Sequence, residues 1–70
     1  MKVIYDEQTD TMNVIFRDDE IKESDEVREG IIVDYGIDDS IVGFEILNAK
    51  KHISQPRYVS YELKPQTTQS

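Results

Sequence analysis

Apolar and polar residues alternate along four short runs of this chain, and polar turns separate the runs. The runs are residues 2–6, 11–17, 31–36 and 41–48. Alternation with a period of two is typical of a strand that presents one apolar face. Two such runs around a short polar turn predict a β-hairpin, so we expect two hairpins in one mostly antiparallel sheet.

A helical segment is expected after the second hairpin. Asn48 can cap a helix start, residues 49–53 can continue it, and Pro56 stops it. We therefore predict an α+β fold in which a helix at 48–54 covers the sheet face that carries Phe44. The alternation also predicts the core, which comprises Val3, Tyr5, Met12, Val14, Phe16, Ile31, Val33, Phe44 and Ile46.

Two segments leave alternatives open. Residues 20–29 are highly charged, with Ile21 and Val27 as their clear apolar residues. A loop leading into a ragged edge strand is favoured there over a short helix, since charges protect an edge from unwanted pairing. In "RYVSYELK", Val59, Tyr61 and Leu63 alternate and could form an added C-terminal strand. We expect a single domain over residues 1–64, followed by a disordered tail over 65–70.

The small size of the chain bears on its assembly. Seventy residues bury little surface, and scaffolds of this size usually need a disulfide, a metal or an oligomer. The absence of cysteine excludes disulfides, and the single histidine, His52, excludes a site with several histidines in one chain. A homodimer is therefore expected, in which the Val59, Tyr61 and Leu63 stripe contacts a second copy.

The charge balance predicts which partners suit the chain. Fifteen acidic and eight basic residues give a net charge of -7. Such a chain is repelled by phosphate, so direct nucleic-acid binding and binding to an anionic membrane are not expected. A small basic protein is the favoured partner. No apolar run has the roughly 20 residues of a membrane span, and the N-terminus lacks a signal-peptide pattern, so a cytoplasmic protein is expected.

Two short motifs resemble a known family. Tyr5, Asp6 and Asp10 form a Tyr-Asp-x-x-x-Asp opening, and Gly43, Glu45, Ile46, Leu47 and Ala49 form a Gly-x-Glu-Ile-Leu-x-Ala close. Together they resemble family 2283 of the domains of unknown function, which are small prokaryotic proteins. The resemblance implies a β-meander with a short helix and suggests small toxin-like partners. It brings no established activity.

The chain departs from the pattern of this family at two positions. Asp39-Ser40 stands where the family often has Asp-Gly, which implies a different turn type, and Asn13 stands where it often has an aromatic residue.

Catalytic and metal-binding interpretations find little support in the residue pattern. His52 is the single candidate base, and no Gly-x-Ser-x-Gly motif is present. Asp34, Asp38 and Asp39 surround one turn and could bind a hard cation, but their spacing is not that of an EF-hand. We therefore expect no enzyme activity, no cofactor and no metal site.

A protein-binding role is the function that the sequence favours. We expect a non-enzymatic module, antitoxin-like in that it covers a basic partner. The alternative is a structural homo-oligomerisation domain, and a divalent-cation or small-ligand binder is a remote alternative. Glu45 is expected on the strand face opposite Phe44, where it meets water or a partner. The candidate partner-binding residues are Asp6, Asp10, Glu45, Val59, Tyr61 and Leu63.

Overall fold

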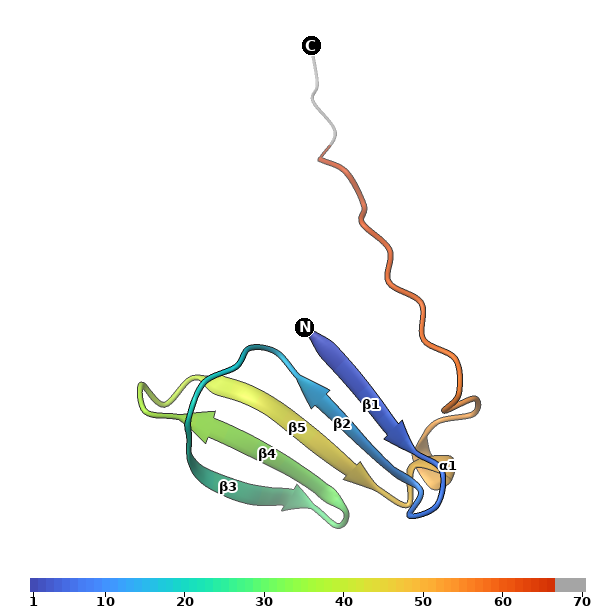
Figure 1. Cartoon of the computed structure of the whole chain (residues 1–70), viewed down its shortest axis with the longest axis horizontal. Coiled ribbons are helices and arrows are strands. Elements are labelled where there is room, and N and C mark those ends of the chain that lie inside the picture. The colour runs from blue at the N-terminus through green and yellow to red at the C-terminus, as the bar shows by residue number, and fades with distance from the viewer. Residues whose placement is uncertain (67–70) are drawn as a thin grey trace.

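The fold is a single antiparallel sheet of five strands with one short helix at its end (Figure 1). The computed structural model describes residues 1–66. The elements in chain order are β1 (Lys2–Asp6), β2 (Thr11–Ile15), β3 (Ile21–Arg28), β4 (Ile31–Gly36), β5 (Ile41–Leu47) and α1 (Ala49–His52). The expected α+β class, with a mostly antiparallel sheet and one short helix, is confirmed.

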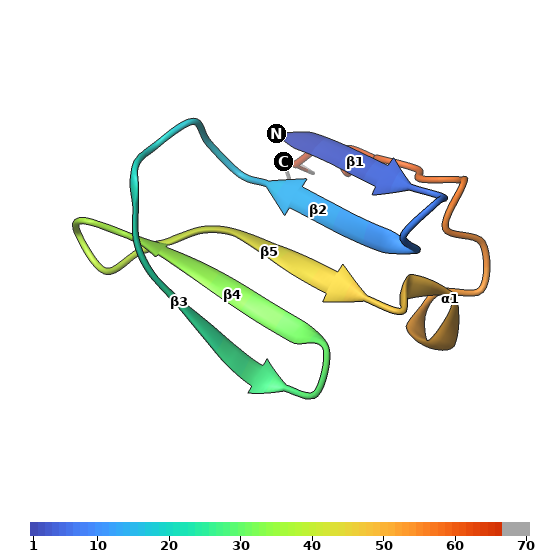
Figure 2. The same ribbon diagram turned by 60° about the horizontal axis from the view of Figure 1, so that its bottom comes forward.

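The strand order is β1-β2-β5-β4-β3, so β5 lies between β2 and β4. Both ends of the sheet are therefore edge strands, β1 on one side and β3 on the other (Figure 2). The last three strands form a meander, but β2 pairs with β5 and not with β3. The single continuous meander implied by the family resemblance is thus corrected, because the chain crosses from β2 to the far edge before it returns.

Strand β3 is longer than its composition indicates. We expected a loop leading into a ragged edge strand; the structure has an edge strand of eight residues, Ile21–Arg28, that pairs with β4 over most of its length, in place of the loop. The register shifts twice, between Ile21 and Glu23 and between Glu26 and Arg28. Pairing with the apolar strand β4 stabilises this strand, although the charged residues of β3 have a low intrinsic preference for strands.

The pairing register places the expected core residues on one face of the sheet. Val3, Val14, Phe44 and Val33 are neighbours in one row across the strands, and Tyr5, Met12, Ile46 and Ile31 form the next row. Phe16 packs edge-on against Phe44, with ring centroids 5.7 Å apart. These nine residues define the apolar face, and the opposite mixed face carries residues that include Ile4, Asn13, Glu45 and Ile32.

Few side chains are buried in this one-layer sheet. Among the described residues, the buried apolar side chains are Met12, Val42, Ala49 and Pro56. The expectation that all nine residues of the apolar face form a buried core is therefore corrected: only Met12 among them is buried. Val42, which was not expected in the core, packs beside Gly36 where the β4–β5 register shifts.

Helix α1 is shorter than expected and is held differently. It spans Ala49–His52 in place of 48–54, and Asn48 makes no capping hydrogen bond through its side chain. Asn48 takes a left-handed conformation, with φ 52°. The helix lies at the end of β5 beside the β1–β2 turn (Figure 1), and the expected cover of the Phe44 face is not confirmed.

The C-terminal segment leaves the sheet after α1. Residues 57–64 form no strand, so the added strand allowed by their alternation is absent from the described part of the chain. The segment starts beside α1 and extends away from the sheet (Figure 1). Of the expected tail, residues 65–70, the last four lie outside the described residues.

Candidate protein-binding surfaces

The opening motif builds a junction between the first hairpin and the helix. The Tyr5 hydroxyl donates to Asp10 Oδ1 at 2.7 Å. The Asp10 backbone oxygen accepts the Ala49 N–H at 2.9 Å, and its carboxylate accepts the Lys50 N–H at 3.2 Å. Asp10 therefore caps α1 from a turn about 40 positions earlier in the chain, a role that we expected from Asn48.

Asp10 also raises the pKa of Tyr5. The hydrogen bond to this carboxylate, with a contribution from burial, raises the pKa of Tyr5 to about 12. A carboxylate that accepts the phenol proton stabilises the neutral phenol and disfavours a second negative charge beside it. This arrangement keeps Tyr5 a hydrogen-bond donor at neutral pH and offers no activated base.

Asp6 shapes the β1–β2 turn. Its Oδ1 accepts the backbone N–H groups of Gln8 at 2.9 Å and Thr9 at 3.3 Å, which is a common role of aspartate in turns. Asp10 completes the turn with a left-handed φ of 54°. Both acidic residues that we selected as partner-binding candidates thus have structural roles in the hairpin.

The closing motif is also explained by close packing. A Cβ added to Gly43 would lie 2.3 Å from the Val14 backbone oxygen, so β5 approaches β2 too closely for a side chain there. Ala49 is 0% exposed and fills the space between the helix and the hairpin turn. The small residues at these two motif positions therefore serve the fold.

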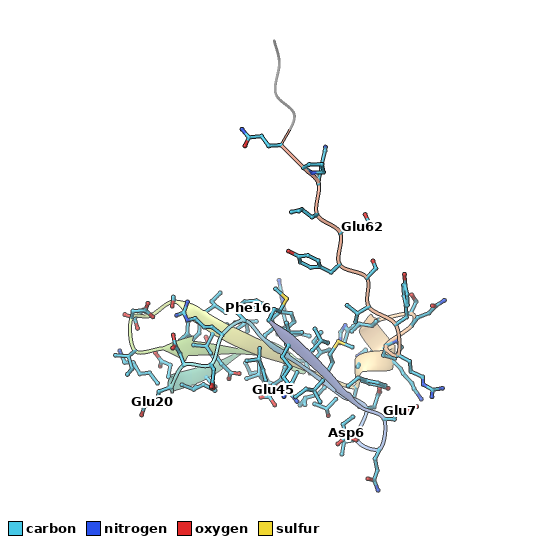
Figure 3. All side chains as sticks on the ribbon, turned by 45° about the horizontal axis from the view of Figure 1, so that its top comes forward. Asp6, Glu7, Phe16, Glu20, Glu45 and Glu62 are labelled. Carbon is cyan, nitrogen blue, oxygen red and sulfur yellow. The ribbon has the colours of Figure 1, made fainter. Side chains whose placement is uncertain are left out.

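Glu45 lies on the mixed face, as its strand parity predicts. It pairs with Asn13 of β2 and Ile32 of β4. Figure 3 shows it on the side of the sheet opposite Phe16. It is half-buried and forms no ion pair with the residues that the structure describes. Its carboxylate is thus available at the centre of this face.

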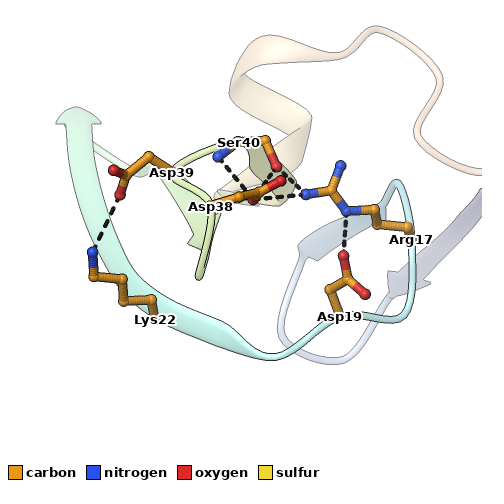
Figure 4. A network of polar contacts seen from close by, with 6 residues as sticks. All are labelled: Arg17, Asp19, Lys22, Asp38, Asp39 and Ser40. Carbon is orange, nitrogen blue, oxygen red and sulfur yellow. Dashed lines mark hydrogen bonds and ion pairs between the residues drawn. The ribbon is translucent and has the colours of Figure 1, made fainter.

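Arg17, which is not among the candidate site residues selected from the sequence, connects side chains at the far end of the sheet (Figure 4). Its Nε lies 2.5 Å from Asp19 Oδ2, and its Nη2 lies 3.3 Å from Asp38 Oδ1 and also contacts the Ser40 hydroxyl. The Ser40 hydroxyl donates to Asp38 Oδ1 at 2.6 Å, and this bond, followed by the Ser40 N–H, lowers the pKa of Asp38.

The three aspartates considered as cation ligands have separate partners. Asp38 contacts Arg17, Asp39 lies 3.3 Å from Lys22 Nζ, and Asp34 accepts the Ser24 hydroxyl at 2.5 Å. Within residues 1–66, no group of three potential metal-ligating side chains is found. Asp39 also takes a positive φ of 66° in this turn.

Negative charge is concentrated at one edge of the sheet. Residues 18–39 contain ten of the fifteen acidic residues and two of the eight basic ones, which gives this segment a net charge of -8. All eight residues of β3 are exposed. We call the exposed carboxylates along and beside this strand the acidic edge; they are Glu20, Glu23, Asp25, Glu26 and Glu29.

The three residues of the C-terminal stripe have different surroundings in the structure. Val59 lines a shallow hollow of about 350 Å³ with Val3, Tyr5 and Pro56, where Arg57 Nε also lies 3.3 Å from Glu7 Oε2. Tyr61 and Leu63 lie further out and are 81% and 79% exposed. The structure therefore brings Val59 to strand β1 but leaves the other two residues of the stripe without cover.

No helix in the described part of the chain has the length and apolar character needed to cross a membrane.

Comparison with known proteins identifies one family. The family described as "Protein of unknown function (DUF2283)" matches residues 2–50, which is more than half of the chain. The matched region runs from β1 into α1, so it contains the Tyr5–Asp10 junction and the acidic edge but not the C-terminal stripe. Neither the curated proteins nor the solved structures gave a match.

Proposed function

The chain belongs to the DUF2283 family of proteins of unknown function, and we propose that it is a non-enzymatic module that binds a basic protein through its acidic edge. The single observation that carries this proposal is the long, exposed and acidic edge strand β3. Such a strand offers both a negative field and a row of unpaired backbone groups.

The partner that fits this surface is an extended basic segment. A peptide that adds to a sheet edge gains main-chain hydrogen bonds, and its alternate side chains set the specificity. Lys or Arg side chains on that peptide would meet Glu23 and Asp25, which are exposed. The same carboxylates would repel β3 of another copy, so the charge favours a basic partner over edge-to-edge self-pairing. An antitoxin that covers a basic toxin would act in this manner.

The roles of the motif residues support a function without catalysis. Tyr5, Asp6 and Asp10 are bonded within the hairpin and to α1, and Gly43 and Ala49 are packing residues. An enzyme needs a base within reach of a nucleophile or a substrate proton. The motif offers a tyrosine with a raised pKa and carboxylates occupied by backbone donors, which suit structural roles better.

A capture experiment with matched variants tests the acidic edge. The tagged full chain is used to capture partners from the cells that produce it, and the candidate is then purified and titrated by calorimetry. We expect a small basic protein at 1:1 stoichiometry whose affinity falls as salt rises. Neutralising the edge with Glu20→Gln, Glu23→Gln and Asp25→Asn should weaken binding by about tenfold or more.

The control removes the same charge elsewhere. Glu7→Gln, Glu45→Gln and Glu62→Gln alter the net charge equally but lie away from β3. This triple variant should retain most of the affinity. An equal loss in both triple variants would assign the effect to net charge alone, and an affinity that does not depend on salt would contradict the proposed edge.

A second function, structural self-assembly, is favoured by a different observation. The apolar face has no second layer over it within the described residues. Glu45 and the stripe of Val59, Tyr61 and Leu63 lie outside the acidic edge and stay candidates for contact with a second copy.

A further inference from the structure

The apolar face has the composition of the inside of a sandwich. Across β1, β2, β5 and β4 its rows contain Val, Tyr, Met, Phe and Ile and no charged residue. Charge appears in these rows only on the edge strand β3, where Asp25 follows Val33 and Arg28 follows Ile31. The neighbouring positions on the mixed face include Lys2, Asp6, Asp34 and Glu45. Separation of this kind is expected when one face is covered and the other meets water.

The isolated chain exposes more surface than its mass accounts for. Its accessible surface is 6016 Å², whereas a compact monomer of 8.2 kDa exposes about 4,500 Å². The excess, about 1,500 Å² per copy by the same scaling, is larger than the roughly 800 Å² that each partner of a standard interface buries. Among the exposed apolar residues, Val3 and Phe16 belong to the apolar face, and Tyr61 and Leu63 belong to the C-terminal stripe.

We propose that the apolar face is covered by the same face of a second copy, and that the Val59, Tyr61 and Leu63 stripe of each copy lies against its partner. The dimer is a two-layer sandwich related by a twofold axis, the usual symmetry of small homodimers. This inference uses the apolar face and the tail, whereas the proposed function uses the acidic edge, so either can fail without the other.

The direction of the C-terminal segment supports contact between this segment and the partner copy. The segment after α1 passes Val3 and Tyr5 at the hollow beside Val59, which lies on the side of the apolar face. It then leaves the sheet on the side that carries Phe16, opposite Glu45 (Figure 3). A second sheet stacked about 10 Å away on that side would stand next to the tail. Tyr61 and Leu63 would then meet the partner in place of water.

The two apolar faces alone are too small for a stable interface, so the C-terminal segments must contribute to it. Four strands spaced about 4.8 Å apart, each about five residues long at about 3.3 Å per residue, project an area of about 320 Å² per copy. Two such faces give about 650 Å², below the roughly 1,000 Å² expected of a stable interface. The stripes of both tails add six apolar side chains and bring the contact into that range.

Salt dependence separates this dimer from the complex with a basic partner. Each copy carries a net charge of -7, and the inner faces carry little of it. The copies repel each other at long range while their apolar faces attract at contact. Raising the salt concentration should therefore strengthen the homodimer, whereas it should weaken a complex made through the acidic edge.

Sedimentation equilibrium of the purified full chain is the first test, with Val14→Lys and Asn13→Lys as paired variants. The two positions are adjacent in β2, face opposite sides of the sheet and are both half-buried. We expect the unaltered chain and Asn13→Lys to be dimers at micromolar concentration, and Val14→Lys to dissociate at least about a hundredfold more readily, because a charge would enter the apolar interface. A monomer for the unaltered chain at high micromolar concentration overturns the proposal.

Two further measurements do not depend on whether Val14→Lys folds. The chain has no cysteine, so a single cysteine can be placed at Phe16 on the apolar face or at Lys2 on the mixed face. The dimer predicts disulfide-linked pairs for Phe16→Cys and none for Lys2→Cys under mild oxidation. Equal cross-linking at both sites, or cross-linking at Lys2→Cys alone, overturns the face-to-face arrangement.

The tail is tested by the paired changes Tyr61→Ser and Leu63→Ser. We expect the dissociation constant of this double variant to rise by at least about tenfold, because two exposed apolar side chains lose their partner surface. An unchanged constant overturns the role of the tail. A monomeric full chain whose residue 59–63 amides are protected from hydrogen exchange would show that the tail covers its own sheet, which overturns the dimer as well.

Discussion

At the scale of single residues, the two family-like motifs of this chain have structural roles in the fold. Asp6 and Asp10 accept backbone N–H groups, and Tyr5 is fixed by Asp10. Gly43 permits a close approach of β5 to β2. Sequence could locate these residues but not their roles, since the donors to Asp10 include a backbone amide about 40 positions away. The motif therefore reports a hairpin joined to a helix.

The first prediction concerns Gly43→Ala. The new Cβ would lie 2.3 Å from the Val14 backbone oxygen, and backbone cannot move aside as a flexible side chain can. We expect a loss of about 1–3 kcal/mol in the free energy of unfolding, measured by urea denaturation. Gly36→Ala is the control, because its Cβ would meet a side-chain atom, Val42 Cγ2, at 3.0 Å. A Gly43→Ala protein as stable as the Gly36→Ala protein would refute the close approach.

The second prediction concerns Tyr5 and alkaline pH. The folded-state pKa of Tyr5 is about 12, above the ordinary value of 10.0, so folding stabilises the protonated phenol. That contribution is fully present below pH 10 and is lost as pH rises through about 12. Tyr5→Phe should be less stable than the unaltered chain at pH 8 and should lose less additional stability between pH 10 and 12. Identical alkaline profiles for the two proteins would argue against the Tyr5–Asp10 hydrogen bond.

At the scale of elements, agreement between sequence and structure depends on whether the cause is local. The strands β1, β2, β4 and β5 follow alternation that is visible in the sequence, and they form where expected. Strand β3 forms because β4 pairs with it, although its own residues are mostly charged. Helix α1 stops at His52 and is capped from another turn, so its local signals gave the wrong cap and a helix that is too long.

The third prediction tests the capping of α1. Asp10→Ala removes the carboxylate that accepts the Lys50 N–H, and we expect a loss of about 1–2 kcal/mol in stability together with faster hydrogen exchange at the Lys50 amide.

Asn48→Gly is the contrasting variant. Asn48 has φ 52° and no capping bond, so glycine relieves backbone strain there. Its stability should be equal to that of the unaltered chain or higher by up to about 1 kcal/mol. Loss of stability in Asn48→Gly with none in Asp10→Ala would reverse this assignment.

At the scale of the whole molecule, the apolar face could be predicted from the sequence, whereas the layer that covers it could not. The nine residues predicted as a core do share one face, because strand pairing preserves their parity. Burial depends on a second layer, and the short helix does not supply one within the described residues. An edge strand was expected within residues 20–29, but its acidic residues were not selected as a candidate surface, because the strand order that exposes them follows from the crossing between β2 and β3.

The last prediction concerns the uneven charge of the molecule. Residues 18–39 carry a net charge of -8, and the carboxylates of β3 stand beside one another with few compensating cations. Folding brings β3 and the acidic β4–β5 turn together, so mutual repulsion opposes the folded state. The ion pairs of Arg17, Lys22 and Arg57 stabilise the folded state, but exposed pairs of this type contribute about 0–1 kcal/mol each to its stability.

Repulsion should therefore dominate the response to salt. Between 0.01 M and 0.1 M NaCl the screening length falls from about 30 Å to about 10 Å, so we expect the unfolding midpoint to rise with salt. A gain of about 1 kcal/mol corresponds to about 4–8 °C for a domain of this size. The measurement is made at one protein concentration, because self-association also raises the midpoint.

The rise should be smaller in the triple variant Glu20→Gln, Glu23→Gln and Asp25→Asn than in the triple variant Glu7→Gln, Glu45→Gln and Glu62→Gln, since only the first reduces the charge repulsion at the acidic edge. A midpoint that falls with salt in the unaltered chain would mean that the ion pairs outweigh the repulsion.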